Sequence, residues 1–257
     1  MEYINNIDIL HRFSNENQSI QHDWSHMIVL SPTSYPLIHP NDMVSILHKF
    51  EGESFIHTES YQSYLDHKDT RVTTRFKYTK VDHSMYDDPM EKVENLGQIA
   101  WNVSRLPKND FYKGEFWSVF AKPAVQVLLE SSLTKEWLIR LSTVQIPDEL
   151  FFQVVSMKHP DLRLYTRNLC LHYASWISRT TGKSLIHPQE FTDPKRDFDL
   201  LQMSASMFAR KFGDKSSHLT ERIRAELHGN SIYADQVYQR MKAACFLAQK
   251  GCTNRHA

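Results

Sequence analysis

The chain contains the stretch Ser206-Met207-Phe208-Ala209-Arg210-Lys211-Phe212, and an upstream stretch reads Pro147-Asp148-Glu149-Leu150-Phe151-Phe152-Gln153. The first places two cations after a helical pattern, and the second places two carboxylates at the start of a helix. Acidic groups near a helix N-terminus and basic groups near a C-terminus also stabilise the helix itself, so each pair has a purely structural explanation. As chemistry, the two pairs suit an enzyme in which a carboxylate deprotonates an acceptor hydroxyl and fixed cations neutralise a departing phosphate.

Composition limits the classes of function. The 257 residues include 30 Lys and Arg against 30 Asp and Glu. This balance argues against the broad basic surface that general nucleic-acid binding needs, so no nucleic-acid partner is expected. Glycine is scarce, with 7 residues, and no glycine-rich phosphate-binding loop occurs. The hydrophobic content of 41% is enough for a substantial core.

The sequence carries few signals of cellular location. Its 3 cysteines have no metal-ligand spacing, which favours a reducing compartment. It shows no signal-peptide pattern and no apolar run of about 18 residues. We therefore expect a cytoplasmic protein without a transmembrane segment, with peripheral attachment to a membrane as the alternative. Nothing in the sequence predicts an oligomeric state.

Apolar patterns predict strands that alternate with helices. Such alternation favours an α/β sandwich with a largely parallel central sheet. We expect a single domain over residues 1–257, with an α/β region at 1–212 and a C-terminal helical extension at 213–257. Residues 61–109 lack a clear period and predict a long surface excursion. The expected strands are 26–31, 53–57, 116–121 and 162–165, and the expected helices are in 1–24 and at 41–50, 124–141, 148–157, 193–208, 217–228 and 232–250.

The two opening stretches, in order with Leu30-Ser31-Pro32-Thr33-Ser34-Tyr35-Pro36-Leu37, resemble a known family. From about Trp24 to Phe212 the chain is similar to the core-2/I-branching β-1,6-N-acetylglucosaminyltransferases and their xylosyltransferase relatives. The resemblance implies a GT-A-like, Rossmann-like fold. It also implies inverting transfer of a sugar, of the GlcNAc or xylose type, from a UDP-sugar to a glycan hydroxyl, as in membrane-associated polysaccharide biosynthesis.

Two departures from the family leave a second hypothesis open. Ser34 stands where the family has an Asp near the presumed donor site, so Ser34 is a candidate substrate-binding residue. Family members also carry roughly one more βα unit, which holds the uridine, ahead of the point where this chain begins. The alternative is therefore a catalytically inactive carbohydrate-binding or assembly subunit derived from the same fold.

The resemblance assigns roles on the acceptor side. Glu149 matches the general base of a Pro-Asp-Glu-x-Phe-Phe motif, and Asp148 beside it is a candidate substrate-binding residue. Glu115 is the reserve base, because the xylosyltransferase branch places a catalytic Asp in this strand. Trp117 belongs to a Gly-x-x-Trp strand that lines the acceptor pocket. An exposed indole would stack on a sugar, whereas a buried one would fill the core.

On the donor side, Lys211 matches a family Lys that contacts the diphosphate. The family's second cation would fall near Pro188 and is not matched, so Arg210 is the candidate to replace it. Fixed cations can take the place of a divalent metal, and we expect no cofactor and no metal requirement. A three-residue acidic pattern, Asp197-Phe198-Asp199, is a weak indication of a metal site because Asp is favoured in the first turn of a helix.

Overall fold

The computed structural model describes residues 24–60, 111–141, 147–178, 181–183, 185 and 187–253. The chain divides into two compact units. Unit 1 comprises Met1–Trp24, Ile56–Phe116 and Lys122–Thr166, and unit 2 comprises Ser25–Phe55, Trp117–Ala121 and Arg167–Ala257. The expected helix in 1–24, apart from Trp24, and the expected surface excursion at 61–109 lie outside the described residues. The expected division at residue 212 stays a prediction.

The described part of unit 1 consists mainly of helices. Helices α6 (Lys122–Glu130) and α7 (Ser132–Leu141) divide the expected helix 124–141 at Ser131. The Ser131 hydroxyl accepts a hydrogen bond from the Leu133 N–H at 3.2 Å, so this serine begins a new helix. Helix α8 (Asp148–Lys158) packs against α7, against the following helix and against strand β5 (Tyr112–Lys113).

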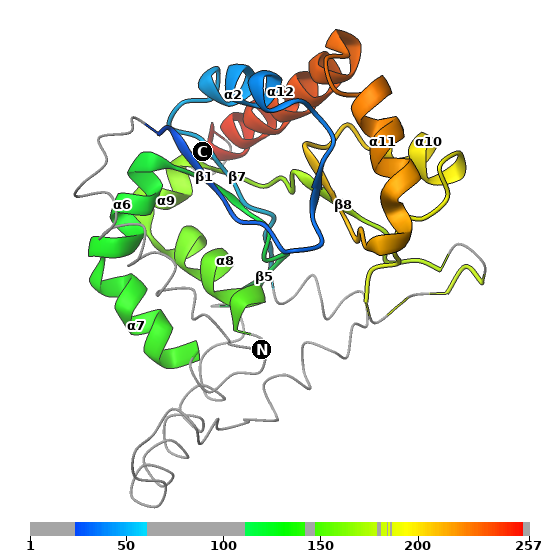
Figure 1. Ribbon diagram of the computed structural model, residues 1–257. Coiled ribbons are helices and arrows are strands. Elements are labelled where there is room, and N and C mark those ends of the chain that lie inside the picture. Colours follow the sequence, from blue (N-terminus) through cyan, green and yellow to red (C-terminus); the bar gives the residue numbers. More distant parts are fainter. Residues whose placement is uncertain are drawn as a thin grey trace, which may run out of the picture. The chain divides into compact units, whose positions relative to one another are not determined.

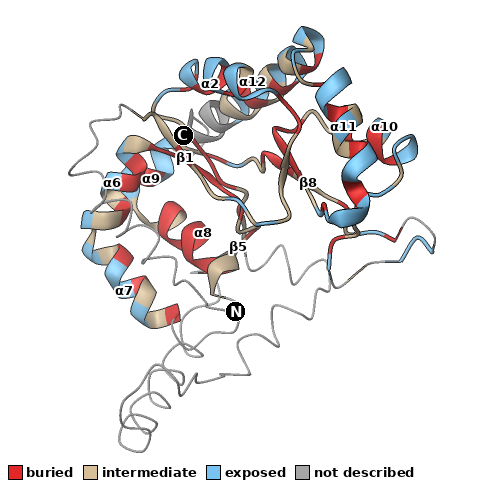
Figure 2. Ribbon diagram, in the orientation of Figure 1, coloured by how far each residue is buried: buried red, intermediate tan, exposed pale blue. Residues whose placement is uncertain are grey.

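Helix α8 is enclosed on nearly all sides. Residues 150–156 are all buried, and Figure 2 shows most of this helix in the colour of buried residues. Only a helix that is apolar around most of its circumference can be buried in this way, and the run Leu-Phe-Phe-Gln-Val-Val has that composition. The predicted helix is therefore confirmed. The buried residues 150–156 fix the position of the N-terminal turn that precedes them.

The expected strand at 162–165 is wrong. These residues belong to helix α9 (Pro160–Tyr165), in which Pro160 occupies the first turn and Asp161 lies at the positive end of the helix dipole. The alternation of Leu and Arg suggested a strand, but the preceding Pro-Asp pair begins a helix. A short strand, β7 (Thr166–Arg167), follows directly.

Unit 2 contains two small sheets. The first has the strand order β1 (His26–Ile28), β6 (Val119–Ala121), β3 (Ser54–Phe55) and β7. The second has the order β2 (Tyr35–Pro36), β9 (Phe208–Arg210) and β8 (His172–Ala174). Strand β6 is antiparallel to both β1 and β3, and β9 is antiparallel to β2 but parallel to β8.

The described sheets are thus mixed, and a mostly parallel sheet is not confirmed. Because β1 and β3 are both antiparallel to β6, they run in the same direction, as the intervening helix α2 (Pro40–His48) predicts. The difference is that β6, which comes from much later in the sequence, lies between them. Val119 pairs with Ile28 on one side and with Phe55 on the other.

Helices α10 (Arg196–Met203), α11 (Ser217–Glu226) and α12 (Ser231–Thr253) complete unit 2, with a 3₁₀ turn at Asp214–Ser216. Figure 1 shows α12 beside α2, with which it is in contact. The expected helix 193–208 ends earlier, at Met203, and the expected last helices at 217–228 and 232–250 are confirmed. Of the two cations of the opening stretch, Arg210 therefore ends a strand and Lys211 follows it, and neither follows a helix directly.

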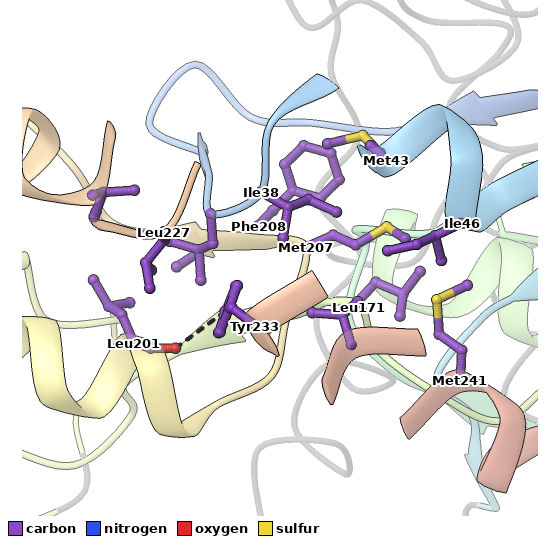
Figure 3. Close-up of a cluster of buried hydrophobic side chains, with 14 of the residues drawn as sticks. Ile38, Met43, Ile46, Leu171, Leu201, Met207, Phe208, Leu227, Tyr233 and Met241 are labelled. Carbon is purple, nitrogen blue, oxygen red and sulfur yellow. Dashed lines mark hydrogen bonds between the residues drawn. The ribbon is translucent and has the colours of Figure 1, made fainter. Parts of the chain in front are cut away.

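The core of unit 2 joins these helices to the second sheet. Its buried side chains come from α2, α10, α11, α12 and the strand β9, and Figure 3 shows part of this cluster. Tyr233 is the polar member of the cluster: its hydroxyl donates to the Leu201 carbonyl at 3.2 Å and lies 2.9 Å from the Ser206 carbonyl. The turn before β9 is thereby fixed to the C-terminal helix.

Candidate active site

Unit 1 places four charged or ionisable side chains on one face of a two-stranded ladder. Strand β4 (Glu59–Ser60) pairs antiparallel with β5, and Glu59 lies opposite Lys113. Side chains two residues apart share a face of a strand. The register continued by two residues therefore brings His57 opposite Glu115 on the same face as Glu59 and Lys113. Opposite charges face each other at both positions.

His57 is the centre of this group. Its Nδ1 makes a short hydrogen bond to the Glu115 carboxylate, and its Nε2 lies 3.4 Å from the Glu59 carboxylate. Burial by itself lowers the pKa of His57, but the hydrogen bond and charge of Glu115 outweigh it, so the pKa is raised above 6.5. Burial likewise acts to raise the pKa of Glu115, and the bond to His57 reverses this to a net lowering.

Glu149 enters the same group from helix α8. It lies in the first turn of that helix with Asp148, and its Oε2 is 3.3 Å from Lys113 Nζ. The Glu149 side chain is 25% exposed and that of Lys113 is 16% exposed. The Glu149 carbonyl also accepts a hydrogen bond from the Gly114 N–H at 3.1 Å. The Glu149 carboxylate thus lies at the start of a buried helix, contacts a lysine and is partly exposed.

Close packing joins the two parts of this group. A Cβ at Gly114 would lie 1.9 Å from the His57 carbonyl oxygen and 3.1 Å from Gln153 Cγ on α8, so only glycine fits between them. The buried amide of Gln153 donates to the Glu115 carbonyl at 2.9 Å. The backbone of residues 113–115 is therefore held from both sides, which fixes the side chains it carries.

In unit 2, the family-like stretch at residues 30–37 packs against the stretch at residues 206–212. Residues 31–34 form a turn in which the Ser34 N–H donates to the Ser31 carbonyl at 2.9 Å, and the two hydroxyls lie 2.9 Å apart. The Phe212 N–H donates to the Thr33 carbonyl at 2.9 Å, and β2 pairs with β9 immediately beyond. Ser34 therefore lies in the turn that adjoins the segment carrying Arg210.

Arg210 lies over the indole of Trp117, with 4.2 Å between the guanidinium carbon and the ring centroid. Trp117 is 5% exposed and its ring also contacts His172. Burial lowers the pKa of Arg210, but an arginine remains a cation at neutral pH. Arg210 Nε and Trp117 Nε1 are both buried without a hydrogen-bond partner among the described residues. The burial of Trp117 fits the core-filling alternative better than stacking on a sugar.

Lys211 and the acidic pattern differ in exposure. The Lys211 side chain is exposed at the end of β9. Asp197 is 0% exposed, and its Oδ2 accepts hydrogen bonds from the N–H groups of Thr192 and Asp193 at 2.7 and 2.9 Å. Asp199 is exposed. Residues two apart lie on different faces of a helix, so these two carboxylates do not converge.

The structure therefore groups the predicted residues within each unit. Glu149, Asp148 and Glu115 belong to unit 1, whereas Ser34, Trp117, Arg210 and Lys211 belong to unit 2. Sequence reasoning missed His57, Glu59 and Lys113. The available signal was the apolar run ending at His57, followed by alternating charges, but its partner strand lies more than fifty residues later.

Comparison with known proteins identifies the family. A profile of the family described as Core-2/I-Branching enzyme matches residues 17–205, which is most of the chain. The chain belongs to this family, as the opening motifs predicted. Arg210 and Lys211 lie just beyond the matched residues.

A curated relative is a plant enzyme. The chain is 24% identical over 195 residues to the protein named Beta-glucuronosyltransferase GlcAT14A from Arabidopsis thaliana. The matched stretch covers 74% of this chain and 40% of the plant protein. The relative's name does not support the expected GlcNAc specificity.

The described residues contain neither a candidate membrane span nor a candidate metal site. No helix in them combines the length and apolar character needed to cross a membrane. Within the same residues, no three His, Cys, Asp or Glu side chains come together as a metal site would need.

Proposed function

We propose that the chain catalyses inverting transfer of a sugar from a UDP-sugar to a glycan hydroxyl, with Glu149 as the general base. In such a reaction the acceptor oxygen attacks the anomeric carbon, its proton passes to the base, and the bond to the diphosphate breaks in one displacement. The family membership supports the class of reaction. The partly exposed Glu149 carboxylate, held by Lys113 at 3.3 Å, is the observation that carries the assignment of the base.

In the same proposal, Arg210 and Lys211 bind the diphosphate of the UDP-sugar. Arg210 has a buried Nε without a partner among the described residues and is held over Trp117, so its remaining donors are directed by packing. A guanidinium in this state suits a phosphate oxygen, because charged hydrogen bonds are strong where water is excluded. The exposed Lys211 adds a second charge. Trp117 then acts as the support of Arg210.

The proposal specifies a UDP-sugar as the donor but does not specify which sugar it carries. The relative's name adds glucuronic acid to the expected GlcNAc and xylose, so all three UDP-sugars belong in the test. Release of UDP in the presence of a glycan acceptor reports transfer. The inactive-subunit hypothesis predicts glycan binding without release of UDP from any of these donors.

Replacing the base provides the decisive test. Glu149→Gln keeps the shape of the side chain but cannot take a proton, so kcat should fall by about 10²–10⁴ while UDP binding is retained. Glu136→Gln is the matched control, because Glu136 forms an exposed ion pair with Arg140 on α7 of the same unit. Equal turnover by Glu149→Gln and the control would transfer the role to Glu115 or remove the enzyme hypothesis.

Metal independence is a separate expectation. If two cations neutralise the leaving diphosphate, chelation of divalent metals should leave the rate unchanged. The rate of UDP release is measured after dialysis against EDTA, with and without added Mn²⁺. Loss of activity that Mn²⁺ restores would show that a metal carries the charge that we assign to Arg210 and Lys211.

A further inference from the structure

We propose that His57 is a positioning residue for the base: by holding Glu115 and Glu59, it leaves Lys113 to Glu149 and so keeps that carboxylate in place. This inference rests on the proposed function for its catalytic meaning. Its structural content, a competition among carboxylates for one lysine, stands on the geometry of unit 1 alone.

The arrangement of charges creates the competition. Among the ion pairs of the described residues, the carboxylates of Glu59 and Glu115 contact His57, and that of Glu149 contacts Lys113. Lys113 lies directly opposite Glu59 in the ladder, yet its ammonium group is 3.3 Å from the Glu149 carboxylate on α8. A cross-strand pair of opposite charge is favourable by itself. Glu59 therefore competes with Glu149 for Lys113 unless Glu59 has another partner.

His57 supplies that other partner. Its two ring nitrogens face different carboxylates, Nδ1 toward Glu115 and Nε2 toward Glu59. A histidine can donate from both nitrogens only when it is protonated. The charges that act on His57 are those of Glu115, Glu59 and Lys113, and the first two outweigh burial and Lys113, so its pKa is raised. The protonated form that the arrangement needs therefore persists to higher pH than in an unperturbed histidine.

Loss of this proton has a defined consequence. As pH rises through the pKa of His57, Glu59 and Glu115 lose their cation, and both then attract Lys113. Glu149 then loses its ion pair with Lys113, and a misplaced base is a poor one. The rate should therefore show a loss on the alkaline side that belongs to His57.

A histidine NMR titration tests the competition without any substrate. The signal of His57 is identified among the 14 histidines by its disappearance in His57→Gln. Glu149→Gln should lower the pKa of His57, because the freed Lys113 moves toward Glu59 and Glu115. The same substitution made in a Lys113→Met chain should have little effect, since the lysine carries the coupling. Glu136→Gln, in the same unit, should leave the pKa unchanged.

Kinetics with the UDP-sugar that the protein turns over fastest tests the catalytic meaning. His57→Gln should lower kcat by about 10-fold with little change in KM, a smaller loss than removal of the base, and should remove the alkaline limb. The double variant His57→Gln/Glu59→Gln should recover part of this rate, because one of the two competing carboxylates is gone. A merely structural role for His57 would not be rescued in this way.

The NMR titration and the kinetic measurements distinguish failure of this inference from failure of the proposed function. If Glu149→Gln lowers the pKa of His57 equally with and without Lys113, or does not lower it, the competition does not exist and the inference is wrong. A kcat of His57→Gln that Glu59→Gln fails to restore overturns the positioning role. If Glu149→Gln itself keeps full activity, the proposed base is wrong, and the titration still decides whether His57 governs Lys113.

Discussion

Gly114 is the residue whose identity the local packing determines most strictly. A methyl group there would lie 1.9 Å from the carbonyl oxygen of His57 and 2.9 Å from its carbonyl carbon, and backbone atoms cannot move aside cheaply. We expect Gly114→Ala to lower the free energy of unfolding by about 1–3 kcal/mol, the usual cost of overpacking. Urea denaturation measures the change.

Gly213→Ala is the control for this prediction. The added methyl there would meet the carboxylate end of Glu190, a flexible side chain, and should cost less. Equal losses in the two variants would contradict the argument for Gly114.

The same residues show what local sequence can predict. Asp148 and Glu149 were placed correctly in the first turn of a helix, because capping preferences and the helix dipole are local effects. His57 and Lys113 were missed, since their roles depend on a pairing between strands that are distant in sequence. Trp117 could have been exposed or buried, and only the tertiary structure decides.

At the scale of elements, helix α12 holds the turn that precedes β9. The Tyr233 hydroxyl accepts from the Ser206 N–H at 3.3 Å and lies 2.9 and 3.2 Å from the carbonyls of Ser206 and Leu201. Burial raises the pKa of Tyr233 to about 12. Tyr233→Phe would leave these buried groups unsatisfied and should lower the free energy of unfolding by about 1–3 kcal/mol. Tyr238→Phe, on the same helix, is the control, and a comparable loss there would refute the assignment.

Sequence patterns predicted most helices but misjudged where some end. The expected helix 193–208 ends at Met203, and residues 208–210 form a strand, because Ala205 has a positive φ of 46° that no helix continues through. Such a turn has no strong sequence signal when the residue is neither Gly nor Asn. The strand order also escaped prediction, since β6 enters between β1 and β3 from a distant part of the chain.

For the whole molecule, the net charge is balanced, so any electrostatic attraction of UDP must come from individual charged side chains near its binding site. With 30 cationic and 30 anionic side chains, the net charge is zero, so no general field attracts an anion. The exposed Lys211 is screened by salt, whereas Arg210 over the buried Trp117 is screened much less. We expect Lys211→Met to weaken UDP binding mainly at low salt and to flatten its salt dependence. Arg210→Met should weaken it at every salt concentration.

Calorimetry with UDP at ionic strengths of about 0.01 M and about 0.15 M distinguishes the two, because the screening length falls from roughly 30 Å to roughly 8 Å between them. Lys49→Met, which removes an exposed lysine of unit 2 that lies over Tyr238, is the control for a change of net charge. If that variant and Lys211→Met change the salt dependence equally, the effect is one of net charge, and the diphosphate does not bind at Lys211. If Arg210→Met binds UDP as the unaltered chain does, the stacked guanidinium serves only to pack against Trp117.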